Sequence, residues 1–113
     1  MKKEGYLLHL GYSGGKFTLE GENEGFEILC HNEFTDDDGT LLGIVFAKSR
    51  VQYATWFYSY FPKSECFTGF NCGHYFRHET TAKTDYFKRL NEIGANLMEK
   101  IKTHYETDED MVL

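Results

Sequence analysis

Four residues in the second half of the chain carry side chains of the types that bind zinc: Cys66, Cys72, His74 and His78. Zinc in proteins takes four nitrogen or sulfur ligands in a tetrahedral arrangement. Cys72, His74 and His78 have the same parity, so an extended strand would project all three from one face. Neither the paired-cysteine spacing nor the helical histidine pair of familiar zinc sites is present. One strand also spaces its side chains too widely to close a site. We therefore expect no cofactor, and we keep the metal site as an alternative.

The cysteines could also serve in thiol catalysis, which needs a cysteine paired with a histidine. Cys30 stands beside His31, but adjacent residues of a strand point to opposite faces, so these two cannot form a dyad. The chain contains no Gly-x-Ser-x-Gly elbow, phosphate-binding loop or dinucleotide fingerprint. The sequence therefore predicts a protein that is not an enzyme. Three cysteines without regular spacing indicate free thiols in a reducing compartment, and we expect the cytoplasm.

The segment Thr-Asp-Asp-Asp-Gly-Thr at 35–40 invites a calcium-loop interpretation. A loop of the EF-hand type with Gly39 at its sixth position would need an acid at Val45, so the pattern fails. Asp side chains cap their own backbone in turns, and Gly follows them readily. We interpret the segment as a solvated turn.

Acidic residues are concentrated before this point. Residues 17–38 contain no Lys or Arg and have a net charge of −8, from Glu20, Glu22, Glu24, Glu27, Glu33, Asp36, Asp37 and Asp38. Residues 39–105 have a net charge of +4, and residues 106–113 have one of −4. Such asymmetry steers partners more than it performs chemistry.

The chain before residue 80 has the alternation of β-strands. Glycine and aspartate mark turns at 13–16, 21–25 and 35–40, where positive backbone angles or side-chain caps are needed. Gly73 predicts a bulge or a close approach in the last strand. Residues 41–47 are continuously apolar, which is typical of a central strand. We expect strands at 5–12, 17–20, 26–30, 41–47, 51–61 and 70–78.

The C-terminal segment changes to a period of three and four residues, which predicts an amphipathic helix over 81–105. Thr80 or Thr81 is the expected N-cap, and Arg89 is placed on the polar side. A flexible acidic tail is expected at 106–113. The apolar positions are Tyr86, Phe87, Leu90, Ile93, Leu97, Met98, Ile101 and Tyr105.

These elements predict an α+β domain over 1–105, in which an antiparallel sheet of five or six strands is packed by one C-terminal amphipathic helix. One helix covers one face of a sheet. The aromatic residues of 51–61 then need a second cover, which we expect to be the tail, a second protomer or a partner. On this reasoning Tyr53, Tyr58, Tyr60 and Tyr75 are candidates for exposed aromatic anchors.

Thr55-Trp56, followed by Gly73-His74-Tyr75-Phe76 and then a helix containing residues 86–93, resembles small uncharacterised proteins of bacterial phages and mobile elements. The resemblance covers about residues 53–93. It implies a genomic setting and no established activity. Trp56 and Phe76 are interpreted as core anchors.

Direct nucleic-acid binding needs a basic face with stacking aromatics. The only basic strip available would come from Arg77, Lys83, Lys88, Arg89, Lys100 and Lys102, and the acidic segment opposes it. We expect no direct nucleic-acid binding and no membrane association.

The sequence instead favours a non-enzymatic, protein-binding regulator or inhibitor from a phage or mobile element. It would act on a host nucleic-acid-handling or defence protein, in the manner of an anti-CRISPR protein. The expected binding residues are the acids and exposed aromatics, namely Glu20, Glu22, Glu24, Glu27, Asp36, Asp37, Asp38, Tyr58, Tyr60 and Tyr75. A homodimerising accessory domain is the first alternative. A small zinc or thiol enzyme using the four Cys and His residues named above is the second.

Overall fold

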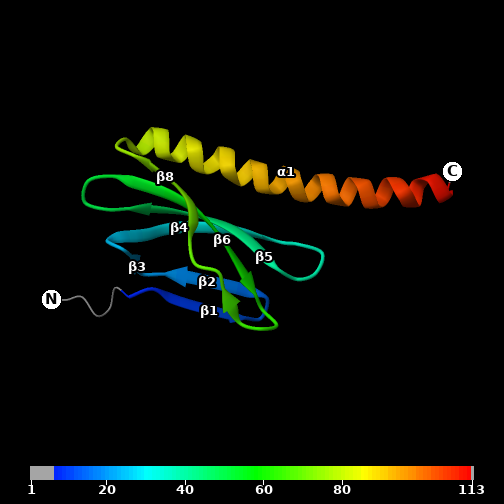
Figure 1. Ribbon diagram of the computed structural model, residues 1–113, viewed down its shortest axis with the longest axis horizontal. Helices are drawn as coiled ribbons and strands as arrows, with labels where there is room; N and C mark the ends of the chain where they lie inside the picture. The colour runs from blue at the N-terminus through cyan, green and yellow to red at the C-terminus, as the bar shows by residue number, and fades with distance from the viewer. Residues whose placement is uncertain (1–6, 113) are drawn as a thin grey trace.

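The computed structural model describes residues 7–112, with side chains described for residues 7–97. It confirms the expected α+β class: one C-terminal helix packs on a curled antiparallel sheet, and a hairpin lies on the other side of that sheet (Figure 1). The elements in chain order are β1 (His9–Ser13), β2 (Lys16–Glu20), β3 (Glu22–Asn23), β4 (Phe26–Thr35), β5 (Leu41–Lys48), β6 (Tyr53–Phe61), β7 (Cys66–Phe67), β8 (Asn71–Phe76) and α1 (Glu79–Val112).

The sheet follows the chain in the order β3–β4–β5–β6, and its pairings are antiparallel. Both β7 and β8 then pair with β6, at its C-terminal and N-terminal ends respectively. The expectation that residues 41–47 form a central strand is confirmed, because β5 lies between β4 and β6 and is almost entirely buried. The short strands β3 and β7 were not predicted, since two residues carry no detectable alternation.

Strand β4 continues to Thr35, beyond the expected 26–30, and a bulge at Leu29 shifts its register against β5 between Ile28 and Cys30. A bulge inserts one extra residue and so reverses which later side chains face each side of the sheet. Before the bulge, Ile28 faces the hairpin layer. After it, Asn32 and Phe34 face the helix, where Asn32 bonds Tyr86 and Phe34 contacts Gly94.

The hairpin β1–β2 covers the sheet face opposite the helix, and it turns through Gly14 and Gly15, both in the left-handed region as the sequence indicated. Phe17 and Leu19 of β2 are buried against the sheet. The expectation that a tail, protomer or partner covers the aromatic strand is therefore wrong, because the chain's own hairpin does so. This core layer contains Phe17, Leu19, Ile28, Leu41, Val45, Ala47, Ala54, Trp56, Tyr58 and Tyr60.

A second core layer lies between the sheet and α1, and its buried members are Ile44, Phe46, Ala82 and Tyr86. Strand β6 supplies side chains to both layers, which explains why apolar residues occupy both of its faces. Trp56 is buried in the first layer as expected. Phe76 packs at the margin of the second.

The helix begins earlier and ends later than predicted. The backbone amide of Ala82 donates to the carbonyl oxygen of His78, 3.1 Å away, so His78 precedes the first turn and neither Thr80 nor Thr81 is the N-cap. The helix ends at Val112, beyond the expected Tyr105. The division into a domain over 1–105 and a flexible tail over 106–113 stays a prediction. Residues 5 and 6 of the first expected strand and residue 113 of the tail lie outside the described residues.

Candidate protein-binding surface

The acids of 17–38 separate into two groups at opposite ends of β4. Glu22, Glu24 and Glu27 lie on the β3–β4 hairpin and are called here the hairpin acids; Asp36, Asp37 and Asp38 form the turn between β4 and β5 and are called the aspartate turn. The two groups lie at opposite ends of the sheet in Figure 1. Ten strand residues span about 33 Å, so the two groups cannot act as one compact face. Glu20, at the end of β2, leads into the hairpin acids.

Within the hairpin acids, Glu22 and Glu27 are direct cross-strand neighbours. Their side chains therefore project from the same face, where like charges repel each other. Among the residues whose side chains are described, no Lys or Arg forms an ion pair with Glu22, Glu24 or Glu27. Lys48 faces Glu27 across β4 and β5, but its ammonium lies over the ring of Tyr53, 5.7 Å from the centroid. The negative charge of this hairpin is left for solvent or a partner.

Glu24 occupies a strained position at the tip of this hairpin. Asn23 pairs with Phe26, so Glu24 and Gly25 form a two-residue turn with φ angles of 52° and 85°. Such turns prefer Asn-Gly, because both central residues need positive φ. A glutamate in the left-handed region is uncommon. The turn therefore holds a carboxylate at the hairpin tip at some expense in stability.

The aspartate turn uses its carboxylates internally. Asp36 accepts a hydrogen bond from the amide of Asp38, and Asp38 accepts from both the amide and the hydroxyl of Thr40. Their carboxylate oxygens lie within 4.8 Å of one another. The expectation of a turn capped by its own aspartates is confirmed.

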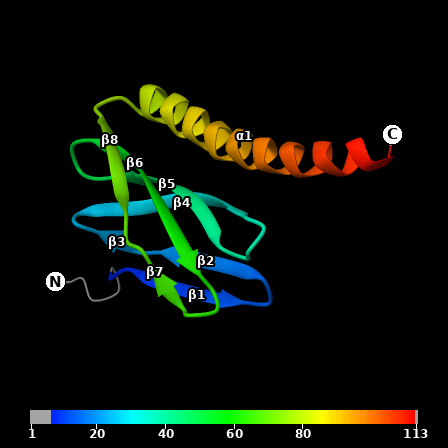
Figure 2. The same ribbon diagram turned by 45° about the vertical axis from the view of Figure 1, so that its right-hand side comes forward.

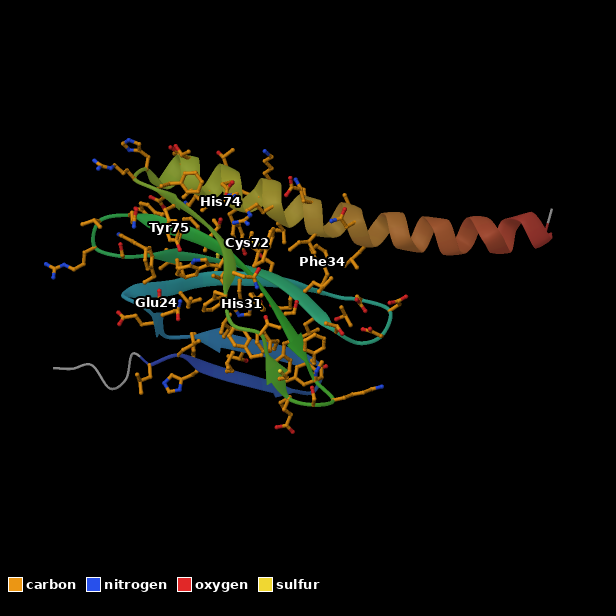
Figure 3. All side chains as sticks on the ribbon, in the orientation of Figure 1. Glu24, His31, Phe34, Cys72, His74 and Tyr75 are labelled. Atoms are coloured by element: carbon orange, nitrogen blue, oxygen red, sulfur yellow. The ribbon has the colours of Figure 1, made fainter. Side chains whose placement is uncertain are left out.

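The aromatic part of the expected surface is mostly wrong. Tyr58 is 2% exposed and Tyr60 is 9% exposed, because β2 lies over both. Tyr75 on β8 is 52% exposed and remains available. Its ring packs on Phe26, and its hydroxyl accepts a 3.0 Å hydrogen bond from Trp56 Nε1. Figure 3 shows Tyr75 at the same end of the sheet as Glu24.

The expected bulge and close approach at Gly73, two residues before Tyr75, are confirmed. The β6–β8 register shifts between Thr55 and Phe57, so β8 has one extra residue opposite Trp56. A Cβ atom on Gly73 would lie 2.6 Å from the hydroxyl of Tyr75 and 2.8 Å from Trp56 Nε1. Cys72, the residue before it, has a φ of 55°. The bulge fixes Tyr75 against Trp56.

The four candidate zinc ligands do not come together. Cys66 is on β7, Cys72 and His74 are on β8, and His78 lies just before α1. Among the described side chains, the aspartate turn is the only group of three or more ligand-type residues whose ligand atoms gather within 4.8 Å. Cys72 is exposed, so its thiol faces solvent and no shared ligand site.

His74 instead belongs to a chain of polar contacts that sequence reasoning missed. Its Nδ1 lies 3.1 Å from both carboxylate oxygens of Asp85 on α1. Asp85 accepts a 2.7 Å hydrogen bond from the buried hydroxyl of Thr55. That hydroxyl in turn accepts one of 2.8 Å from Arg89 Nη1. The chain joins α1 to β6 and β8 at a point where the sequence showed only a polar helix face.

Arg89 corrects the predicted helix face. It is 4% exposed, whereas the sequence placed it on the polar side and in the basic strip. Its guanidinium lies over the ring of Phe57, 4.0 Å from the centroid, and also donates to the carbonyl oxygens of Thr55 and Cys72. An apolar stem and five donors let arginine do this inside a core.

A second polar cluster lies under the β1–β2 hairpin, near the middle of the sheet (Figure 3). The hydroxyl of Tyr58 donates to Glu33 Oε1 at 2.7 Å, and His31 Nδ1 lies 2.7 Å from the same oxygen. Burial raises the pKa of Glu33, but the hydrogen bonds with His31 and Tyr58 and the charge of His31 outweigh it, so the pKa is lowered from its ordinary value of 4.5. Burial, then the bond to Glu33 and its charge, raise the pKa of Tyr58.

Tyr86 forms a similar link on the helix side. Its hydroxyl donates a 2.7 Å hydrogen bond to the side-chain oxygen of Asn32. Burial and then the neighbouring Cys30 raise the pKa of Tyr86, so its hydroxyl keeps its proton and stays a donor. Both tyrosines therefore act as fixed hydrogen-bond donors.

Comparisons with known proteins found no matching family model, no matching curated protein and no matching solved structure. Within the described residues, no helix combines the length and the apolar character needed to cross a bilayer.

Proposed function

We propose that this protein is a non-enzymatic binding protein from a phage or mobile element that regulates or inhibits a host nucleic-acid-handling or defence protein. The observation that carries the proposal is the cross-strand pair Glu22 and Glu27, whose charges no described cation neutralises. Like charges placed directly opposite each other destabilise a sheet. A hairpin that keeps them gains a surface complementary to a basic partner.

The hairpin acids suit a partner that binds nucleic acid. Such proteins carry Lys and Arg in the groove that receives phosphates. Three carboxylates on one short hairpin can occupy the same cations and so compete with the nucleic acid. Glu24 supports this role, because the left-handed backbone at the hairpin tip would be better suited by another residue.

Tyr75 supplies the apolar anchor of the proposed surface. Its ring is half exposed, yet it is held by Phe26 and by the hydrogen bond from Trp56. An aromatic side chain that is already fixed loses little conformational freedom on binding, which is typical of residues that dominate an interface.

The proposal is tested by association kinetics with a partner recovered by affinity capture. The triple variant Glu22→Gln/Glu24→Gln/Glu27→Gln should associate about tenfold more slowly than the wild type at low salt, and the difference should shrink at high salt. The matched control is Asp36→Asn/Asp37→Asn/Asp38→Asn, which removes the same charge from the other end of β4 and should keep the wild-type rate. A DNA oligonucleotide should displace the wild-type protein from its partner. Equal rates for the wild type and the hairpin variant would refute the proposal.

A further inference from the structure

Helix α1 is much longer than the sheet that it covers. Its 34 residues span about 51 Å at the α-helical rise. Among the side chains described, those to residue 97, its contacts with the core run from Ala82 to Gly94, which approaches the ring of Phe34. The two ribbon views agree that the rest of the helix extends past the turn between β4 and β5 (Figures 1 and 2). Most of the stability of a helix in a protein comes from packing its apolar face, so the part of α1 beyond the sheet would be stabilised by a partner.

The outer side of the first half of α1 presents apolar surface. Phe87 is 56% exposed. It lines a shallow open depression with Thr84, Lys88, Asn91, Glu92 and Ala95. This outer depression faces away from the sheet.

Beyond the sheet, the sequence continues the line of Phe87 and Asn91, which runs along the border between the outer depression and the side on which Gly94 approaches Phe34. Starting from Phe87 and Asn91, steps of three, four and seven residues lead to Met98, Ile101, Tyr105 and Val112. These spacings keep residues on one side of an α-helix and are those of a heptad repeat. A second helix is the partner that such a stripe fits.

The charges along α1 indicate that the partner helix is a second copy of α1 and that the two helices run antiparallel. Segments 84–90, 91–97, 99–105 and 106–112 carry net charges of +1, −1, +1 and −4. In a parallel pair of identical helices, each segment would lie beside its own charge. In an antiparallel pair centred on residue 98, segment 84–90 meets 106–112 and segment 91–97 meets 99–105, so every contact joins opposite signs.

We infer that α1 is a self-association surface and that two copies of this chain pair their helices antiparallel about residue 98. The C-terminal half of each helix lies over the outer depression of the other. The pairing would also reduce an unfavourable electrostatic interaction at the C-terminal end of α1. Its last turn has acids and no basic residue, which opposes the helix dipole, and Lys88 of the second copy lies opposite Asp108.

Sedimentation of the full chain from low micromolar to submillimolar concentration tests this inference. The wild type should change from monomer to dimer. Lys88→Glu and Asp108→Lys should each raise the dimer dissociation constant by about tenfold, because each creates like-charge contacts. An equimolar mixture of these two variants should recover the wild-type affinity, since each reversed charge then meets its opposite.

Two controls separate this result from general charge effects. Lys63→Glu, in the loop between β6 and β7, makes the same charge change away from α1 and should dimerise like the wild type. The hairpin variant Glu22→Gln/Glu24→Gln/Glu27→Gln should do so too, so the inference stands apart from the proposed function. A wild type that stays monomeric throughout, or a mixture of the two helix variants that associates no better than each alone, would overturn it.

Discussion

Arg89 Nη2 donates a 2.6 Å hydrogen bond to the main-chain carbonyl oxygen of Cys72, and so a buried cation of the helix holds the bulge of β8. The same guanidinium binds Thr55 through both its carbonyl and its hydroxyl oxygen. Three acceptors on two strands are thus satisfied by one side chain. The position of α1 on the sheet and the conformation of the bulge beside Tyr75 depend on this residue.

Replacing Arg89 should therefore strongly destabilise the folded protein. Arg89→Ala should lower the free energy of unfolding by about 2–4 kcal/mol, because it leaves buried acceptors without donors and removes the packing on Phe57. Lys83→Ala, at an exposed position earlier on the same helix, should change it by no more than about 0.5 kcal/mol. Urea unfolding followed by tryptophan fluorescence measures both, and similar losses for the two variants would contradict the structure.

The left-handed backbone of Cys72 predicts an unusual order of substitutions. Gly and Asn should be tolerated to within about 0.5 kcal/mol, whereas Val, whose branched side chain clashes at positive φ, should cost about 1–2 kcal/mol. Cys66→Val is the matched control, because Cys66 lies on a strand outside the left-handed region and valine favours strands. Chemical denaturation of the four variants checks the order, and a Cys72→Val protein as stable as the wild type would exclude the bulge.

Glu33 predicts acid sensitivity. Its pKa is lowered in the folded protein, so it contributes stability above the pKa of the unfolded chain. That contribution is lost as the pH falls from about 4.5 through the lowered value. Glu33→Gln should flatten this part of the stability curve, and Tyr58→Phe should weaken it by removing one of the bonds that lower the pKa. Unfolding at a series of acid pH values tests this, and identical slopes for wild type and Glu33→Gln would count against it.

Glu24 predicts a conflict between stability and binding. Glu24→Asn should stabilise the protein by about 0.5–1 kcal/mol, because asparagine suits the first position of this turn, but it should weaken partner binding. Glu65 also has a positive φ, of 53°, so Glu65→Asn is a matched control that should stabilise without affecting binding. Thermal unfolding and partner affinity, measured together, distinguish the two sites. Weaker binding by both variants would remove the special role of the hairpin tip.

Much of the fold follows from local pattern. Alternation, glycine turns and the change of period at residue 80 predicted most of the strands, the central position of β5 and the helix. The bulge at Leu29 was not predicted from the sequence. One inserted residue reverses which side chains face each side of the sheet, but it does not change the composition of the strand. The covering of the second sheet face by the β1–β2 hairpin was not predicted either. A short strand such as β2 has too few apolar residues to indicate what its buried face packs against.

The site was less predictable than the fold. The acids were visible in the sequence, but their separation into the hairpin acids and the aspartate turn depends on strand register. The contacts of Arg89 and Asp85 with the sheet could not be predicted from the sequence. A helical pattern assigns charged residues to the solvent side, and it cannot show a buried hydrogen-bond partner on a strand. Tyr58 and Tyr60 were misassigned for the same reason, since exposure depends on what packs over a strand.

The most direct test of the central claim is a parallel affinity capture from bacterial lysate with three baits: wild type, the hairpin variant and the aspartate-turn variant. Wild type and the aspartate-turn variant should retain the same basic, nucleic-acid-handling protein at low salt. The hairpin variant should lose it, and high salt should release it. Retention of that protein by the hairpin variant at the wild-type level would contradict the claim that the hairpin acids form the binding surface.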